Sequence, residues 1–416
     1  MNKKPVNGMK DILPDEMAVR DFCTDVITKT YAEFGFQRME TPAMESIENL
    51  QSRQGGENEK LIFKILKRGE KLHLDTAETE EDVTDCGMRY DLTVPLARYY
   101  ANHMAELASP FKSLQIGPVW RADRPQRGRY RQFTQCDIDI LGEESILAEI
   151  ELILATTTVL GKLGFRNFTI RINDRRILRA MAEAAGFPEE ALEKVFIILD
   201  KMDKIGMEGV RGELLGEGYA EESVDRYLAL FGLTGEGREV LEKLDEALGT
   251  FSPAASIADL VTIMETVESA KSGDFAVAFD PTLVRGMSYY TGPIFEIAMD
   301  ELGSSVGGGG RYDRMIGRFA GTDVPACGFS IGFERIILIL MEQGFKVPGA
   351  AEKTAYLLDK NADASLYAKA FSMAAKDRSE GKCATVLRKK KNVRFQKEQL
   401  AAQGYANILD IRREEN

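Results

Sequence analysis

The segment from 111 to 141 constrains the fold most strongly, because it contains two long strand-like stretches joined by a short basic loop. FKSLQIGPVWR and QFTQCDIDILG are rich in β-branched and aromatic residues, and ADRPQRGRYR between them has the proline and glycine of a turn region. A loop this short joins antiparallel strands, since a parallel pair needs a crossover of a dozen or more residues. We therefore predict an α+β fold, an antiparallel sheet flanked by helices, and not a doubly wound sheet.

Other segments add helices and strands to this sheet. Apolar residues at helical spacing predict a helix over 17–36 that stops at Gly35, and another over about 143–163. LIFKIL and KLHLD, between 61 and 75, are predicted strands, and a helix is expected to open after Pro95. FTIRIND at 168–174 is a further predicted strand.

The character of the chain changes twice along its length. From 175 to 272 it is helical and broken by Gly and Pro, with Ser252 a predicted N-cap before Pro253 at the first helical position. Near the C-terminus, strands and helices alternate, which indicates a small parallel α/β domain. The predicted organisation is a core in two parts with a helical insertion, followed by the small domain: 1–174, 175–272, 273–343 and 354–416.

Composition excludes several classes of site. The two histidines and five cysteines are scattered without a CxxC pair, which excludes an ordinary zinc site and argues against a disulfide framework. No apolar run approaches a membrane span, and MNKKPVNGMKDILPDE precedes no apolar stretch, so we expect a cytoplasmic protein. The net charge of −12 argues against general nucleic-acid binding, but 121–131 carries five arginines and 388–397 carries six positive groups. Solvated loops are the alternative explanation for both.

One further segment combines a strand-like pattern with a cation. LVRGMSYYTGPIFEI at 283–297 places Arg285 inside an apolar run, ahead of the adjacent Tyr289 and Tyr290.

Several motifs in order resemble one family. IGPVWRADRPQRGRYRQFTQCDIDILG and ACGFSIGFERIILIL resemble the second and third motifs of class II aminoacyl-tRNA synthetases, and GFQRMETPAMES around Pro42 resembles the first. Within that class, QGGENEKLIFKI, MRYDLTVPLARYY, VRGMSYYTGPIFEI and GGGRYD resemble the histidyl-tRNA synthetase family. The resemblance covers residues 8–343 and implies a six-stranded antiparallel sheet. It also implies a reaction that joins histidine to ATP and then to tRNA(His).

The resemblance also implies the roles of individual residues. The implied histidine pocket comprises Asp91, Thr93, Gln135, Asp139, Tyr289, Tyr290 and Tyr312. The implied ATP site comprises Arg121, Asp123, Phe133 and Arg335, and the implied catalytic cations are Arg285, Arg121 and Arg335. Acids that meet an amino group and an imidazole N–H, with tyrosines as walls, suit histidine. Fixed cations suit the charge that develops on the α-phosphate.

The remaining implied contacts concern tRNA, metal and a second subunit. The tRNA contacts would come from Arg124, Gln126, Arg127 and Arg129 in the basic loop and from Lys389, Lys390 and Lys391 in the C-terminal domain. ATP implies Mg²⁺, whose ligands the sequence leaves unassigned, and the first motif implies a homodimer.

The chain departs from the family pattern at three points. Ser288 stands where the family usually has Asp, Asp123 replaces the more widespread Glu, and the C-terminal domain ends after three predicted strands, as expected of a shortened form. The alternative function is a non-catalytic relative, the regulatory subunit of ATP phosphoribosyltransferase, which generally lacks the C-terminal domain. A tRNA-sensing module would need a partner domain that this sequence does not contain.

Overall fold

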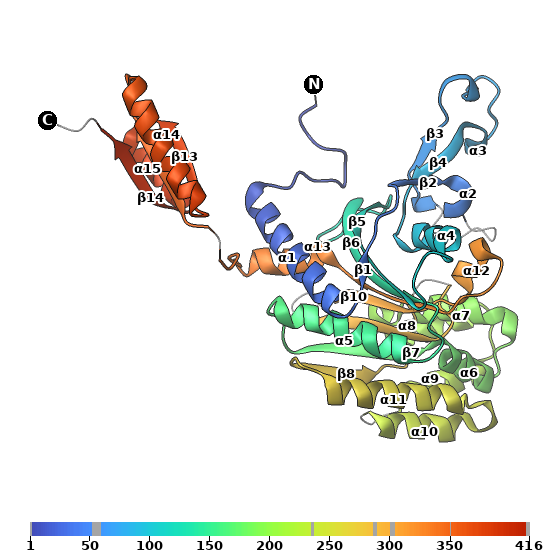
Figure 1. The fold of residues 1–416 in the computed structure, drawn as a ribbon. Helices are drawn as coiled ribbons and strands as arrows, with labels where there is room; N and C mark the ends of the chain where they lie inside the picture. Colours follow the sequence, from blue (N-terminus) through green and yellow to red (C-terminus); the bar gives the residue numbers. More distant parts are fainter. Residues whose placement is uncertain are drawn as a thin grey trace. The chain divides into compact units, whose positions relative to one another are not determined.

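Figure 1 shows the computed structural model of the chain, which describes residues 2–51, 60–233, 237–285, 289–299, 304–349 and 351–412. The chain divides into two units, Met1–Phe345 and Lys346–Asn416. The first unit contains an eight-stranded sheet and a small three-stranded sheet, and the second contains a three-stranded sheet.

The eight-stranded sheet has six antiparallel strands in its middle and one parallel strand at each edge. β5 and β6 pair without interruption from Phe111 opposite Leu141 to Trp120 opposite Gln132. This confirms the predicted hairpin and the antiparallel sheet. The strands, in spatial order, are β1 (Gln37–Arg38), β5 (Phe111–Trp120), β6 (Gln132–Leu141), β11 (Ala326–Ile331), β10 (Ser304–Arg311), β9 (Pro293–Met299), β7 (Phe168–Asp174) and β8 (Phe275–Phe279).

Helices bury the apolar side chains of this sheet. α5 (Leu147–Lys162) packs on β6 and β11, α11 (Ala254–Ala270) on β7 and β8, and α13 (Phe333–Glu342) on β6 and β10. α1 (Pro14–Glu33) lies against α5 and α13 and begins three residues earlier than predicted. Gly35, which follows it at φ 81°, provides the predicted glycine stop. Ile138 and Ile140 on β6 are almost completely buried, so this strand has an apolar face and a second, polar face.

A series of helices lies between β7 and β8. The hydroxyl of Ser252 donates to Asp245, and no side-chain hydrogen bond caps α11, so the predicted N-cap role of Ser252 is wrong. A side-chain acceptor on a neighbouring helix has taken the hydroxyl that capping would need. The helices are α6 (Arg175–Ala185), η3 (Glu189–Ala191), α7 (Leu192–Leu199), α8 (Met202–Gly216), α9 (Glu221–Leu230), α10 (Arg238–Leu248) and η4 (Gly249–Phe251), followed by α11.

The smaller sheet of the first unit joins β2 (Met44–Ser46), β4 (Thr84–Met88) and β3 (Lys64–Leu66). The predicted strand KLHLD is wrong, because residues 69–71 form the 3₁₀ helix η2 and the residues after it form turns. α4 (Thr93–His103) begins two residues before Pro95, which therefore sits in the first helical turn, where its missing N–H leaves no hydrogen bond unmade. The remaining short helices are α2 (Ile47–Leu50), α3 (Glu80–Val83) and α12 (Arg314–Ala320).

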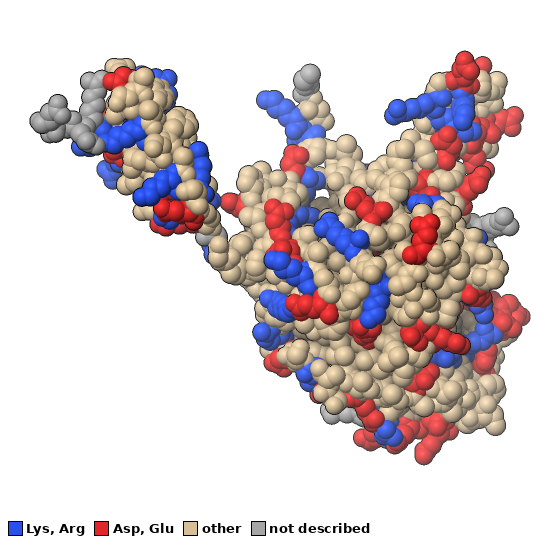
Figure 2. All heavy atoms as spheres, in the orientation of Figure 1, with Lys and Arg blue, Asp and Glu red and all other residues tan. Residues whose placement is uncertain are grey.

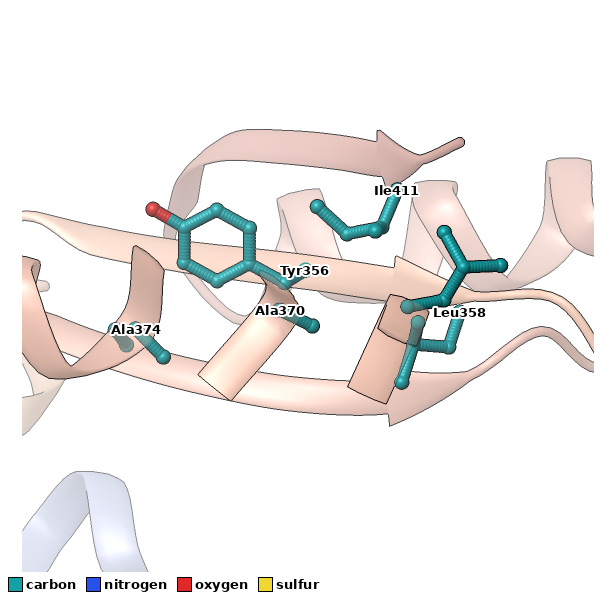
Figure 3. Close-up of a cluster of buried hydrophobic side chains, with 7 residues drawn as sticks. Tyr356, Leu358, Ala370, Ala374 and Ile411 are labelled. Carbon is teal, nitrogen blue, oxygen red and sulfur yellow. The ribbon is translucent and has the colours of Figure 1, made fainter. Parts of the chain in front are cut away.

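The second unit is the small parallel α/β domain that the alternating pattern predicts. β12 (Lys353–Leu358) lies between β13 (Cys383–Arg388) and β14 (Tyr405–Ile411), parallel to both. α14 (Ala364–Ser379) covers a cluster that includes Tyr356, Leu358 and Ile411 (Figure 3). α15 (Val393–Ala402) packs on β14, and the side chain of Asn392 caps its N-terminus.

Candidate functional site

The polar face of the large sheet forms the floor of a cavity of about 260 Å³. Its lining comes from β6, β10 and β11, from the start of α4 and α13, and from the loops that carry Arg121 and Arg285. The twelve residues predicted for histidine binding, ATP binding and catalysis all lie in this lining: Asp91, Thr93, Arg121, Asp123, Phe133, Gln135, Asp139, Arg285, Tyr289, Tyr290, Tyr312 and Arg335. The fold thus brings into one cavity residues that lie up to 244 positions apart in the sequence, Asp91 and Arg335 (335 minus 91).

Strand β6 contributes three polar residues to the lining because side chains on a strand alternate between its faces. Gln135, Asp137 and Asp139 all line the cavity. Asp139 Oδ1 accepts a hydrogen bond from the Tyr312 hydroxyl at 2.6 Å, while Oδ2 is buried without a partner among the described residues. Burial, with a smaller contribution from Asp91, raises the pKa of Asp139 to about 7. A cationic group placed at Oδ2 would restore the ionised form.

Asp137 is a third buried acid of the lining that the motif comparison did not select. Ser330 lies opposite it on β11, and its hydroxyl donates to Asp137 Oδ1. Burial and the neighbouring Asp139 hold the pKa of Asp137 well above its ordinary value. The sequence does contain a signal for Asp137. This residue lies two positions from both Gln135 and Asp139 on one strand, so it shares their face of the sheet.

Asp91 lies just before α4 and is 4% exposed. Its Oδ1 accepts a hydrogen bond from the backbone N–H of Val94 at 3.0 Å, which fixes the carboxylate at the start of the helix. Burial is the main reason that the pKa of Asp91 is raised. Together with Asp137 and Asp139 it gives the cavity three buried acids that form no salt bridge among the described residues.

Three tyrosines form one wall beside these acids. The ring centroid of Tyr289 lies 4.8 Å from that of Tyr290 and 5.9 Å from that of Tyr312. A β carbon on Gly328, which faces Asp139 across the β6–β11 pair, would overlap the Asp139 carboxylate. Only glycine at position 328 therefore leaves room for the Asp139 carboxylate beside the tyrosines.

Arg121 enters the lining at the end of β5. Its Nε donates to the Tyr90 carbonyl at 3.0 Å, and its guanidinium lies 4.2 Å from the ring centroid of Tyr90 and 5.2 Å from that of Phe133. Two aromatic faces hold the guanidinium in place, and it forms no salt bridge with an acid of the described residues. Its terminal nitrogens make no hydrogen bond within the described part of the chain, so they are available to an anion.

Arg285 has a different backbone from the one the sequence predicts. The strand-like run does not form a single strand: β9 begins only at Pro293, and Arg285 has a left-handed φ of 59°. Its Nη1 donates to Glu296 on β9 at 3.1 Å, and a β carbon on Gly308 would lie 2.6 Å from the same nitrogen. Strained backbone of this kind is concentrated at functional sites. Ser288, the predicted departure from the family pattern, lies outside the described residues.

Arg335 completes the cationic part of the lining. It belongs to the first turn of α13, and its Nη1 donates to the Ser305 carbonyl. Burial and the nearby Arg129 lower its pKa, although a guanidinium stays charged at any ordinary pH. Its neighbour Glu334 is bound by Arg20 of α1 at 2.6 and 2.8 Å and by the backbone N–H of Thr134 at 3.1 Å.

Buried polar atoms without partners show where a ligand belongs. In the described residues, the lining contributes three such atoms, Gln135 Oε1, Asp139 Oδ2 and Arg285 Nε. Native proteins rarely leave buried polar groups unpaired without a functional reason. The cavity also holds Arg121 and Arg335, which form no salt bridge among the described residues. Acids, an amide and such arginines together suit a ligand that carries both positive and negative groups.

The predicted tRNA contacts in the first unit lie at the tip of the β5–β6 loop. Arg124, Gln126, Arg127 and Arg129 are all exposed, and Gln126 and Arg129 close a tight turn through paired backbone hydrogen bonds. Arg127 is ion-paired with Glu342, whereas Arg129 also lines the cavity. The loop therefore reaches from the cavity to the surface.

The three predicted lysines of the second unit differ in their surroundings. Lys389 is 15% exposed in its side chain and lies 2.8 Å from Asp359 and 3.2 Å from Asp410, so its charge is largely neutralised. Lys390 and Lys391 are exposed and have no ion pair among the described residues. Figure 2 shows lysine and arginine side chains gathered on the visible face of this unit.

The donor set does not form a resident metal site. Among the described residues, no three His, Cys, Asp or Glu side chains gather closely enough to hold an ion. Nor is any described helix long and apolar enough to span a bilayer.

Comparisons with known proteins agree with the geometry. The family model described as Histidyl-tRNA synthetase matches residues 8–336. The histidine–tRNA ligase of Leifsonia xyli is 49% identical over 347 residues, which are 80% of this chain and 79% of the relative. The probable histidine–tRNA ligase of Tropheryma whipplei (strain Twist) is 43% identical over 373 residues, which are 87% of this chain and 85% of the relative.

Solved structures show the same fold. The crystal structure of histidyl-tRNA synthetase from Nostoc sp. PCC 7120 matches with a TM-score of 0.78 at 26% identity, over 97% of this chain and 90% of that one. An ATP phosphoribosyltransferase regulatory subunit/histidyl-tRNA synthetase from Bacillus halodurans also matches at 0.78, with 22% identity over 99% and 98% of the two chains, and supports the fold alone. The chain belongs to the histidyl-tRNA synthetase family, with the antiparallel sheet of class II synthetases at its centre.

Proposed function

We infer that the chain is a histidine–tRNA ligase, which activates histidine with ATP and transfers it to tRNA(His). The observation that carries this inference is the cavity, in which buried acids and unneutralised arginines stand together. Relatives that are named histidine–tRNA ligases are 39–49% identical to this chain over most of its length.

Histidine is the ligand that the acidic part of the lining fits. Asp139 Oδ2 and Gln135 Oε1 are buried acceptors without partners in the described residues, and they suit an imidazole N–H and an ammonium group. Tyr289, Tyr290 and Tyr312 supply flat walls for the ring, and Asp91 with Thr93 closes the pocket at α4. A pocket that pairs both polar ends of the side chain rejects apolar isosteres strongly.

ATP fits the arginine-bearing part. Phe133 offers a face for the base, and Arg121 and Arg335 offer guanidinium groups for the phosphates. A carboxylate oxygen of histidine attacks the α-phosphorus, and pyrophosphate leaves with the electron pair of the broken P–O bond. Negative charge grows on the α-phosphate in this step, and Arg285, fixed by Glu296, is the cation we assign to it.

The second step moves the histidyl group to tRNA. A terminal ribose hydroxyl of tRNA attacks the adenylate carbonyl, AMP leaves with the electrons of the C–O bond, and a proton is released. The exposed loop with Arg124, Gln126, Arg127 and Arg129 lies beside the cavity and suits the acceptor end. In the second unit, Lys390 and Lys391 suit phosphates better than Lys389 does, since Lys389 already contacts two acids.

Mg²⁺ is proposed to arrive with ATP. Magnesium at nucleotide sites is held mainly by phosphates and water with one or two carboxylates. Asp123 is a partly exposed acid in the lining, 3.9 Å from Arg129, and fits such a single contact. The metal would offset phosphate charge, while Arg121 and Arg335 orient the nucleotide.

The cellular setting and assembly are proposals of the same kind. The segment around Pro42, which resembles the first class II motif, supports a homodimer, and we propose the cytoplasm as its location. A molar mass of twice 46.3 kDa by light scattering is the expected result.

Pyrophosphate exchange with each amino acid in turn tests the proposal. Exchange with histidine, followed by charging of tRNA(His), is the expected result. Histidine binding without exchange would point to the regulatory function instead.

A further inference from the structure

The loop that carries Arg285 is held by its surroundings and not by strand pairing. Residues 280–285 follow β8 and have no regular secondary structure beyond one turn. In that turn, the backbone N–H of Leu283 donates to the Asp280 carbonyl, and the hydroxyl of Thr282 donates to Asp280 Oδ1 at 2.6 Å. After it, the φ of 59° at Arg285 costs about 1–2 kcal/mol for a residue with a β carbon. Such a backbone persists only where contacts outside the loop fix it.

Asn173 supplies two of those contacts. It is the next-to-last residue of β7 and is completely buried. Its Nδ2 donates to the carbonyls of Pro281 at 3.2 Å and Leu283 at 3.0 Å, and its Oδ1 accepts from the backbone N–H of Asp174 at 2.8 Å. Both amide hydrogens are thus used to hold the loop against the sheet.

Arg175, the first residue of α6, supplies the next contact along the loop. Its Nη1 donates to the Val284 carbonyl at 3.4 Å, one residue before Arg285, and its backbone N–H donates to the Gly292 carbonyl at 3.0 Å. The guanidinium lies 4.7 Å from the ring centroid of Phe196 on α7. One residue therefore holds the chain before Arg285 and the chain just before β9, which carries Glu296.

We propose that Asn173 and Arg175 are positioning residues for adenylate formation, acting through Arg285. They fix the backbone of 281–284, and Glu296 fixes the guanidinium over Gly308. The contacts therefore hold both the backbone and the guanidinium of Arg285 in place. Neither Asn173 nor Arg175 lines the cavity. The proposal rests on the proposed function, because it assigns Arg285 to the α-phosphate.

A double-mutant cycle in the pyrophosphate exchange assay tests the proposal. Asn173→Asp is nearly isosteric and keeps the acceptor for Asp174, but it removes both donors. It should lower the kcat of exchange by about tenfold to a hundredfold, since a misplacement of about 1 Å can cost that much. The KM for ATP should change by less than about twofold. In an Arg285→Ala background the same change should have almost no further effect, because the group it positions is absent.

Further variants separate positioning from folding. Arg175→Met keeps the backbone donor and an apolar contact for Phe196 but loses the hydrogen bond to Val284, so a fall in kcat is expected, with partial recovery in Arg175→Lys. Thr282→Val removes a hydrogen bond of 2.6 Å within the same loop and should leave exchange within about twofold. Melting curves of all variants establish that they fold, and Asn173→Ala replaces Asn173→Asp if the buried acid unfolds the chain.

The outcomes distinguish this proposal from the proposed function. If Asn173→Asp or Asn173→Ala lowers kcat equally with and without Arg285, or lowers it no more than Thr282→Val does, the positioning role is refuted. If the parent protein itself shows no histidine-dependent exchange, the proposed function fails first.

Discussion

Replacing Asp139 with Asn should make the ligand-free protein more stable and its histidine complex weaker. Asp139 is 3% exposed, and burial raises its pKa from the ordinary 3.8 to about 7. The unfolded chain therefore loses the proton near pH 4, whereas the folded protein keeps it to about pH 7. The contribution of the Asp139 carboxyl to the free energy of unfolding is therefore fully present below pH 3.8, and it is lost as the pH rises to about 7. Asn carries no charge, and its oxygen still accepts from Tyr312.

The size of the effect follows from the two pKa values. At about 1.36 kcal/mol per pH unit, the ionised Asp139 costs the folded parent about 4 kcal/mol at pH 8 and about 1.6 kcal/mol at pH 5. The new amide N–H of the substituted side chain needs a hydrogen-bond partner, which reduces the stability gained by the variant by about 1–3 kcal/mol at both pH values. The advantage of the variant should thus shrink by about 2.5 kcal/mol between pH 8 and pH 5. Histidine loses a charge-assisted hydrogen bond, so its Kd should rise about tenfold to a hundredfold.

Thermal melting of the parent and Asp139→Asn between pH 5 and pH 8, with and without histidine, measures both effects. The expected result is a melting temperature that favours the variant most at pH 8, together with a smaller histidine-induced increase in the variant. A variant that melts below the parent at pH 8, or that responds to histidine as the parent does, would refute the reasoning. Asp123→Asn, at a partly exposed acid of the same cavity, is the matched control for the loss of one carboxylate.

Three other perturbations have defined outcomes. Arg285→Ala should lower histidine-dependent pyrophosphate exchange by about a hundredfold to a thousandfold while ATP binding, measured by calorimetry, changes little. Arg20→Ala leaves the Glu334 carboxylate buried without its cation, which should destabilise the first unit by about 3–5 kcal/mol in thermal unfolding. Changing Lys390 and Lys391 together to Gln should weaken tRNA binding and reduce the slope of log K against log salt by about 1 to 2.

Matched variants show which cause is at work. Arg285→Lys keeps a charge without the planar fork, and full activity would mean that charge alone suffices there. Glu334→Gln should destabilise less than Arg20→Ala if the stranded acid is the cause. Lys389→Gln should leave the salt slope unchanged, because Asp359 and Asp410 already neutralise that lysine. An equal loss of slope would show that this pairing opens when tRNA binds.

The residues that the family resemblance selects line one cavity, and some of them belong to a pattern with fixed places in a sheet. Gln135 and Asp139 are two residues of one alternating strand, and Gly328 lies opposite Asp139 in the register of β11. The same alternation contains Asp137, which a comparison of motifs alone passes over. The hairpin is equally predictable, since its loop length selects an antiparallel pair.

Features that depend on distant partners are not visible in the sequence. The run around Arg285 has the composition of a strand, yet its backbone turns left-handed, and the contacts from Asn173 and Arg175 come from more than 100 residues earlier. Ser252 precedes a helix and has the right side chain for a cap, but Asp245 takes its hydroxyl. At Arg285 hydrogen bonds from distant residues outweigh the local preference, and at Ser252 a hydrogen bond to the preceding helix does so.

The strand order of the large sheet has a consequence for synthesis on the ribosome. β6 ends at Leu141, but its neighbour β11 begins at Ala326, 185 residues later (326 minus 141). At about 5–20 residues per second, the nascent chain exposes one edge of β6 for about 10 to 40 s. During that time its acids face water and its backbone donors lack their partners. The unpaired edge of β6, a strand that also carries the apolar Ile138 and Ile140, can bind a chaperone or another nascent chain.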